Sequence, residues 1–519
     1  MRAAAPHLRT ACALLAAICL PGRVAAQEGC RYADDGNDVL QAINTPGQGR
    51  VTYISNPHFL CEDGVEIWAD SAVAYSGQAM SQLVGSVRYR DRTRELRATQ
   101  ARYFTEVGRL QAQGNVRVTN TEDGSVIENG DLVYLRETDF REQEEMTVTT
   151  GADGIRPRAL VRPARADSAA AGQPGPPYTV EGDRIVLRGS AYFSSTGDVR
   201  IERDSLLAFG DSAEYGEASG DLVLVGSART ESGAYTLVGR TITIGAAASD
   251  TSEIHARRDA LLTGEDMVVN APHITLYVAS GAVERLVAVP LASGDSAAVP
   301  EGGTGSDDTA RPVALAEDFE LTADSLEMIA PNDVVERILA AGAARSVSRS
   351  RDSLNVELLP DIARSDWLEG DTVVISLRQV ADTLPDATTT ETEYEIERIV
   401  ARVGARSLYR LPPEDSASVP GIDPPAVHYV MGDEITLIMV DGEVQSMEVV
   451  GQTRGVHLEP LRADSAAAAD SVPVAAARAG ADALSLANAR GPASAAPPAP
   501  ESTVFMQPPL PRRRPWIPR

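Results

Sequence analysis

The residues of this chain that could do chemistry are a recurring aspartate, a few histidines and two cysteines. The aspartate opens short runs of strand-forming residues at Asp70, Asp131, Asp183, Asp211, Asp324, Asp371 and Asp433. Carboxylates that converge on one point would bind calcium, but each copy here follows Ala or Gly and precedes a different predicted strand. An aspartate there can accept backbone N–H bonds and fix a turn. We expect a structural role, with a metal site as the alternative.

No catalytic motif accompanies these residues. Beyond the first 26 residues, the histidines are His58, His255, His273, His428 and His457, each isolated in the sequence. The sequence has no nucleophile elbow, zinc-protease motif, phosphate-binding loop, CxxC pair or dinucleotide fingerprint. We expect structural or surface histidines, and solvated side chains in the run Glu142, Glu144 and Glu145. The sequence predicts a protein that is not an enzyme and needs no cofactor or metal.

Residues 1–26 have the pattern of a secretory signal peptide. Arg2 and Arg9 flank the start, residues 11–20 form an apolar run, and small residues precede Gln27. A run of this length is too short to span about 30 Å of hydrocarbon, so we expect cleavage rather than a membrane anchor. The predicted location is the periplasm, with association with the outer membrane left open.

Removal of the signal leaves Cys30 and Cys61 as the remaining cysteines. In an oxidising compartment, two cysteines predict one disulfide. Closing a loop of about thirty residues would stabilise the fold by roughly 3–4 kcal/mol on the chain-entropy estimate. A catalytic redox pair is the alternative, but it usually has CxxC spacing, which is absent.

The charge of the chain excludes one class of partner. The 519 residues carry a net charge of −27, with a pI of about 4.7, and every fixed cationic side chain is Arg. Binding to nucleic acid needs a cationic surface, so we expect no nucleic-acid partner. Acidity of this degree keeps a β-rich protein soluble and discourages association between strand edges.

The elements that carry these residues are repeated strands. Clear copies are ADSAVAY (69–75), LVGSVRY (83–89), LRATQARY (96–103), LQAQGNVRV (110–118) and GDLVY (130–134). Tyr75, Tyr103 and Tyr134 lie 28 and 31 residues apart, a period that indicates stacked β rungs. Period-2 alternation and Asp-Gly turns favour antiparallel hairpins, and residues 37–43 give the one helical signal. The predicted fold class is all-β and antiparallel.

Composition divides the chain into blocks. Residues 153–177, residues 291–314 and the chain after about 460 are rich in Ala, Pro, Gly, Ser and Asp and lack β periodicity. We expect disordered linkers and a disordered tail there. The predicted organisation is a signal peptide (1–26), a β domain (51–150), a second β block of the same kind (178–290), further β repeats (316–460) and an Ala/Pro-rich tail (461–519).

Residues 51–148 resemble the N-terminal domain of the organic-solvent-tolerance family, which includes the periplasmic bridge protein of lipopolysaccharide transport. The matching strings are ADSAVAY, LVGSVRY, LRATQARYF and LQAQGNVRVTNTEDGSVIENGDLVYL. The resemblance implies a folded-over β-jellyroll, in which two antiparallel sheets meet along one edge and leave an apolar groove. It also implies that the groove binds acyl chains of lipopolysaccharide, and that copies stack end to end with other transport proteins. This chain differs in being several times longer than the bridge protein and strongly acidic.

An apolar groove needs inward-facing aliphatic and Tyr side chains rather than catalytic groups. The candidates are Tyr75, Leu83, Val87, Leu96, Tyr103, Leu110, Val116 and Val118. Burial of one acyl chain of about twelve carbons would gain on the order of 10 kcal/mol before costs. We therefore expect a non-catalytic binder of lipopolysaccharide or another acylated envelope lipid. Two alternatives stay open: a structural β-solenoid of the cell envelope whose interior these residues fill, and a β-helix carbohydrate hydrolase, which would need a carboxylate pair.

Overall fold

The computed structural model of the protein describes most of the chain between Cys30 and residue 460. The described residues are 30–33, 40–46, 49–61, 64–139, 141–162, 177–189, 192–216, 218–245, 251–264, 267–291, 310–349, 354–381, 392–411, 424–440, 443–460 and 504–506. The predicted signal peptide and nearly all of the predicted tail lie outside them. None of the described residues belongs to a helix long and apolar enough to cross a membrane.

The chain forms two compact units. The first contains Met1–Gly124 and Glu128–Glu144, and the second contains Ser125–Ile127 and Glu145–Arg519. The predicted block at 178–290 and the predicted repeats at 316–460 both belong to the second unit, and β23 in one pairs with β26 in the other.

The described part of the chain is almost entirely antiparallel β-structure and contains no α-helix. Three single 3₁₀ turns interrupt it, at η1 (Ser76–Gln78), η2 (Pro331–Asp333) and η3 (Asp361–Ala363). The helix expected at residues 37–43 is wrong where the structure describes it, because residues 40–43 belong to a strand. Pairing with the next strand outweighs the weak helical preference of this segment.

The strands of the first unit are β1 (Cys30–Tyr32), β2 (Leu40–Thr45), β3 (Gly49–Ser55), β4 (His58–Cys61), β5 (Glu66–Trp68), β6 (Ser71–Tyr75), β7 (Met80–Arg90), β8 (Arg94–Phe104), β9 (Arg109–Gln113), β10 (Arg117–Asn120) and β12 (Asp131–Leu135). They form two sheets. The first sheet has the order β1-β4-β5-β7-β8-β10. The second has the order β2-β3-β6-β7-β8-β9-β12. The long strands β7 and β8 contribute one half to each sheet.

The second unit extends the same plan over more strands. The strands before the second predicted linker are β11 (Val126–Glu128), β13 (Glu145–Thr149), β14 (Arg158–Val161), β15 (Tyr178–Glu181), β16 (Arg184–Arg188), β17 (Tyr192–Arg203), β18 (Leu206–Gly216), β19 (Asp221–Ser232), β20 (Tyr235–Gly245), β21 (Thr251–Thr263), β22 (Met267–Ala279) and β23 (Ala282–Val289). The remaining strands are β24 (Val313–Ala316), β25 (Phe319–Thr322), β26 (Ser325–Ile329), β27 (Arg337–Ser348), β28 (Trp367–Ala381), β29 (Thr392–Leu411), β30 (Ala426–Val440), β31 (Glu443–Val450), β32 (Arg454–Leu458) and β33 (Val504–Met506). The expectation of disorder is wrong at β14 in the first predicted linker, at the start of β24 in the second and at β33 in the predicted tail, because each of these segments pairs with a neighbouring strand.

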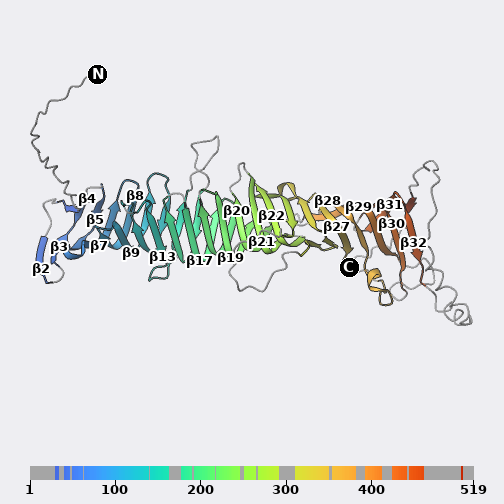
Figure 1. Ribbon diagram of the computed structural model, residues 1–519, viewed down its shortest axis with the longest axis horizontal. Coiled ribbons are helices and arrows are strands. Elements are labelled where there is room, and N and C mark those ends of the chain that lie inside the picture. Colours follow the sequence, from blue (N-terminus) through green and yellow to red (C-terminus); the bar gives the residue numbers. More distant parts are fainter. Residues whose placement is uncertain are drawn as a thin grey trace, which may run out of the picture. The chain divides into compact units, whose positions relative to one another are not determined.

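Two sheets again share long strands in the second unit, which Figure 1 shows following one another in chain order. The first sheet has the order β11-β14-β15-β17-β18-β19-β20-β21-β22-β24-β25-β27-β28-β29-β30-β32. The second has the order β13-β16-β17-β18-β19-β20-β21-β22-β23-β26-β27-β28-β29-β30-β31-β33.

Each long strand passes from one sheet to the other through a β-bulge, and we call the line of these bulges the seam. In β7 the register shifts between Val84 and Val87, and in β19 it shifts between Val225 and Ala228. The bulge in β19 contains Gly226 and Ser227, with φ of +75° and +47°. Two left-handed residues in succession turn the strand sharply, a conformation that strongly favours glycine. The bulges of β7, β17, β19 and β27 each contain a left-handed glycine, whereas that of β21 contains Arg258 and Asp259 instead.

The recurring aspartate lies on the seam. A Cβ built on Gly226 would lie 2.2 Å from Oδ2 of Asp211, so the carboxylate occupies the space that the glycine leaves. The same contact joins Asp70 to Gly85, Asp183 to Gly197, Asp324 to Gly342 and Asp433 to Gly451. These aspartates are exposed and lie in separate rungs, and no group of three or more His, Cys, Asp or Glu in the described ranges is arranged to hold a metal ion.

Two arginines also stabilise the backbone of the seam, each by the same set of contacts. Arg156 donates to the carbonyl oxygens of Gly197 and Asp198, each at 2.6 Å, and its Nε lies 3.0 Å from Asp183. Arg311 donates to the carbonyl oxygens of Gly342 and Ala343 at 2.9 and 2.7 Å, with Nε 3.0 Å from Asp324. Because these pairs are largely exposed, they fix backbone geometry more than they add ion-pair stability.

We predict that Gly226→Ala destabilises the second unit by about 2–4 kcal/mol, because Ala would need a left-handed φ and would overlap Asp211. The matched control is Gly154→Ala: its φ is +76°, but no atom lies within 4 Å of the added Cβ. The control should cost only about 1 kcal/mol. Thermal and urea unfolding of both variants measures the difference, and Asp211→Ala in the Gly226→Ala background should recover part of it. Equal losses in the two variants would contradict this account of the seam.

Candidate functional site

The eight residues predicted to line a groove all lie in the first unit, and both sheets contribute. Leu83, Tyr103 and Leu110 belong to the second sheet and are 0%, 3% and 0% exposed. Val87, Leu96 and Val118 belong to the first sheet and are 1%, 2% and 3% exposed. Val116 precedes β10 and is 2% exposed. Tyr75 is the exception, half-buried in β6.

Strand pairing brings most of these residues together. Leu96 pairs with Val118, and Tyr103 pairs with Leu110. Leu83 and Val87 each pair with an alanine of β8. Rings from opposite sheets also meet, since Tyr89 of the first sheet lies 6.2 Å from Tyr103 of the second, centroid to centroid. The two sheets therefore face each other across an apolar interior from which solvent is excluded.

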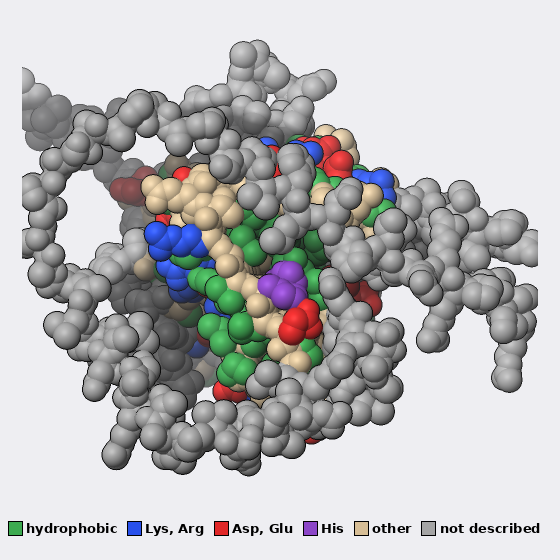
Figure 2. Space-filling model, turned by 90° about the vertical axis from the view of Figure 1, so that its right-hand side faces the viewer, with side chains coloured by type: hydrophobic (Ala, Val, Ile, Leu, Met, Phe, Trp, Pro, Cys, Tyr) green, Lys and Arg blue, Asp and Glu red, His purple; other side chains and the backbone are tan. Residues whose placement is uncertain are grey.

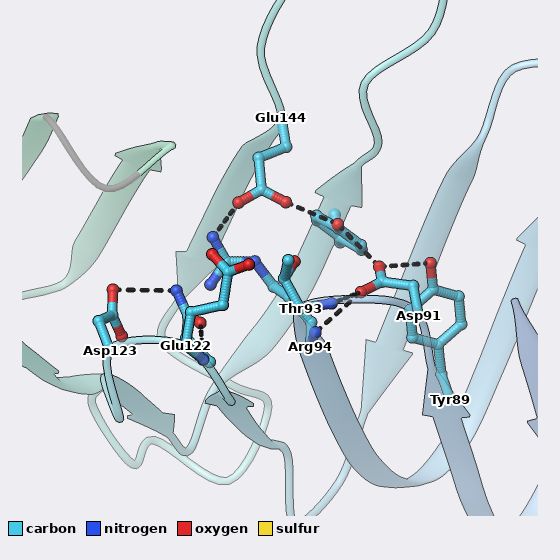
Figure 3. Close-up of polar contacts among 9 residues, drawn as sticks. Tyr89, Asp91, Thr93, Arg94, Glu122, Asp123 and Glu144 are labelled. Carbon is cyan, nitrogen blue, oxygen red and sulfur yellow. Dashed lines mark hydrogen bonds and ion pairs between the residues drawn. The ribbon is translucent and has the colours of Figure 1, made fainter. Parts of the chain in front are cut away.

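The two sheets also approach each other on the side opposite the seam, which we call the mouth. There, strand ends and turns meet through side chains. In the first unit, the turn between β7 and β8 carries Asp91. Oδ2 of Asp91 accepts hydrogen bonds from the hydroxyls of Tyr89 at 3.0 Å and of Tyr134 in the second sheet at 3.1 Å. Oδ1 accepts from the backbone N–H groups of Thr93 and Arg94 at 3.0 and 2.8 Å, as Figure 3 shows.

A buried ion pair completes the mouth of the first unit. The guanidinium of Arg94, whose side chain is 6% exposed, pairs with Oε1 of Glu144. Oε2 of Glu144 accepts the hydroxyl of Tyr134 at 2.7 Å. Figure 3 shows Glu144 reaching the cluster from a segment separate from that of Asp91 and Arg94. The expectation that Glu144 is solvated is therefore wrong, because folding brings it against Arg94, and Glu145 pairs with Arg188 at 3.0 Å.

Burial raises the pKa of both phenols in this cluster. Desolvation is the main cause at Tyr134 and at Tyr89, and the charge of Asp91 adds to the increase at each. Both hydroxyls therefore keep their protons at neutral pH and serve as donors across the mouth.

The mouth of the second unit is closed in a similar manner. Ser232 in the first sheet donates its hydroxyl to the carbonyl of Gly281 in the second at 2.9 Å. Tyr235 reaches the carbonyl of Asp333 at 3.4 Å, and the Asp333 carboxylate accepts the N–H of Val283 at 2.6 Å. An aromatic cluster of Tyr178, Phe193 and Tyr215 lies farther toward β15, with centroids 5.3–5.8 Å apart.

The cysteines and histidines occupy other places. A disulfide joins Cys30 in β1 to Cys61 in β4. His58 stacks on Trp68 at 4.9 Å, and His255 and His273 both contact Thr275. The rings of His428 and His457 lie 4.0 Å apart. Each of these histidines therefore contacts a side chain on its own strand or on the strand paired with it.

Sequence reasoning missed the polar residues of the mouth, namely Tyr89, Asp91, Arg94 and Glu144. The signal that could have found them is the pattern Tyr-Arg-Asp-Arg-Thr-Arg at residues 89–94, a charged turn that directly follows an inward-facing Tyr. Glu144 lies 50 residues beyond Arg94 and carries no comparable local signal.

No protein-family model matches the chain. No curated protein matches its sequence either. The class that the residues define is an antiparallel β-protein of repeated strands with two facing sheets and an apolar interior.

We predict that the first unit loses stability at alkaline pH because of Tyr134 at its mouth. The pKa of Tyr134 is higher in the folded state than the unfolded value of about 10, so the folded phenol keeps its proton where the unfolded one loses it. This contribution is complete below about pH 10 and is lost as the pH rises further. Melting temperatures between pH 8 and 11 should fall less steeply for Tyr134→Phe than for the native chain. Parallel curves would show that Tyr134 does not carry the effect.

Proposed function

We propose that this protein binds the acyl chains of an amphipathic envelope lipid between its two sheets, without catalysing a reaction. The observation that supports the proposal most directly is the asymmetry of the two sides of each unit. Continuous backbone joins the sheets at the seam, whereas side-chain contacts hold them together at the mouth. Sheets joined in this way can separate along the mouth while the seam stays intact.

We propose a folded-over β-jellyroll as the fold of both units. Two antiparallel sheets that share bent strands and enclose an apolar interior are consistent with a folded-over β-jellyroll. The resemblance of residues 51–148 to the organic-solvent-tolerance family points the same way, toward lipopolysaccharide or another acylated lipid. A protein of this kind would act in the periplasm during lipid transport or assembly of the outer membrane. The Cys30–Cys61 disulfide is compatible with an oxidising compartment.

Strand edges without a partner strand among the described residues support a second part of the proposal, assembly with other transport proteins by β stacking. In the first unit β2 pairs with β3, and Leu40 and Ile43 in β2 are 48% and 46% exposed. In the second unit β32 pairs with β30, and Val456 and Leu458 are 53% and 59% exposed. Figure 2 shows hydrophobic side chains gathered on that end of the second unit. Apolar edge strands of this kind favour the addition of a partner strand.

A structural envelope protein with a filled interior is the second candidate. Seven of the eight predicted groove residues are no more than 3% exposed, so their side chains fill the interior of the first unit. On the lipid-binding proposal, acyl chains enter by separating the sheets. On the structural proposal, the side chains are simply a permanent core.

Photocrosslinking distinguishes the two candidates. A photoreactive side chain at Val87 or Val118, both inward-facing, should crosslink to lipopolysaccharide in cells. Probes at the exposed neighbours Arg88 and Arg117 serve as matched controls and should give no lipid adduct. Mass spectrometry of the adducts identifies the lipid. Folded variants with no lipid adduct at either interior position would favour the filled core.

The affinity for single-chain lipids should depend on chain length. Each additional CH₂ removed from water contributes about 0.8 kcal/mol, so the Kd should fall about fourfold per carbon. Titration calorimetry with saturated chains of about ten to fourteen carbons, below their micelle concentrations, measures this slope. An affinity that does not change with chain length would mean that the chains stay outside the interior.

A further inference from the structure

Arg94 is a buried cation at the boundary between the mouth and the apolar interior. The residue is 5% exposed, and its Nε is buried without a hydrogen-bond partner among the described residues. It begins β8, whose next inward residues are Leu96 and Ala98. A buried guanidinium is costly unless anions and acceptors compensate it. Stability alone does not explain a cation in this place, since an apolar side chain would fill it at lower cost.

The anion that compensates Arg94 is the carboxylate of Glu144, which makes few contacts with the other residues of the cluster. Glu144 lies in the segment between β12 and β13, and its second oxygen depends on the hydroxyl of Tyr134. That hydroxyl has one hydrogen, which lies within reach of both Glu144 and Asp91. Asp91 keeps two backbone donors and Tyr89 in any case, whereas the partners of Glu144 among the described residues are Arg94 and a shared phenol. Glu144 is therefore the replaceable acceptor of the cluster.

Similar donors recur at the mouth. Arg136 donates to the hydroxyl of Tyr103 at 3.0 Å in the first unit. In the second unit, Arg203 donates to the hydroxyl of Tyr178 at 2.6 Å and covers its ring at 4.7 Å. Guanidinium and phenol groups directly beside an apolar interior match an amphiphile with an anionic head, because phosphate oxygens accept several such donors at once.

We propose that Arg94 anchors the anionic phosphate head of an amphiphile whose chain lies between the sheets, and that Glu144 occupies the guanidinium until the ligand replaces it. This inference rests on the proposed lipid-binding function. It adds the chemical class of the lipid head group and the residue that binds it. Tyr134, which keeps its proton, remains available as a second donor to the incoming head.

The test compares three ligands with the same twelve-carbon chain on the full chain: dodecyl phosphate, dodecanol and dodecyltrimethylammonium. Titration calorimetry below the micelle concentrations should give dodecyl phosphate the lowest Kd, about tenfold below that of dodecanol. Arg94→Gln should make the two Kd values equal while leaving that of dodecanol unchanged. Arg117→Gln, at an exposed arginine, is the matched control and should keep the preference.

We expect Glu144→Gln to change the Kd of dodecyl phosphate in the direction opposite to the change caused by Arg94→Gln. Removal of the competing carboxylate should lower the Kd of dodecyl phosphate several-fold and leave that of dodecanol unchanged. A merely structural Glu144 would not tighten anion binding when removed. This variant also decides the matter if Arg94→Gln fails to fold, which circular dichroism and thermal melts would reveal.

The outcomes separate this inference from the proposed function. If dodecanol and dodecyl phosphate bind equally, or if Arg94→Gln keeps the preference, the anchor is overturned while lipid binding stands. If none of the three ligands binds, the proposed function fails, and the anchor fails with it. Inorganic phosphate is the last ligand to test. If its Kd is close to that of dodecyl phosphate, the site binds free phosphate, and the assignment to an amphiphile is overturned.

Discussion

The fold depends on one local constraint, the close packing of an aspartate carboxylate against a left-handed glycine of the neighbouring strand. At Asp211 and Gly226 the two residues share a space too small for any added Cβ. The glycine permits the bulge, and the bulge turns the strand from one sheet into the other. Where Arg156 or Arg311 is present, it fixes the carbonyl oxygens that the bulge exposes. At these rungs the bend is thus specified by a few atoms.

This constraint determines what the interior can be. Because the strands bend at the seam, side chains on the inner faces of both sheets point at one another, and period-2 alternation makes those side chains apolar. Among the described residues, the opposite side has no comparable backbone connection. Polar side chains meet there instead, as Asp91 meets Tyr134 and Ser232 meets Gly281. On the lipid-binding proposal, the sheets would separate at these side-chain contacts while the seam keeps them joined.

Much of the fold could be predicted from the sequence because its signals are local. Alternation in β10 and the repeated Asp, Gly and Tyr positions each act within one or two strands, so the antiparallel all-β class followed from them. The burial of Leu83, Leu96 and Leu110 followed from the same alternation. The segment at residues 40–43 was assigned wrongly because its partner strand, not its own preference, decides its conformation. Arg94 and Glu144 could not be paired in advance, since only the completed stack brings residues 50 positions apart into contact.

The seam has one more consequence, which concerns size. At five bends a glycine packs against an aspartate that precedes it closely in the chain, so these contacts need nothing from distant parts of the chain. Duplication of one hairpin would therefore lengthen a unit without altering its cross-section. Chains built on this plan can change in length by whole hairpins over evolution, with the capacity of the enclosed space growing in equal steps.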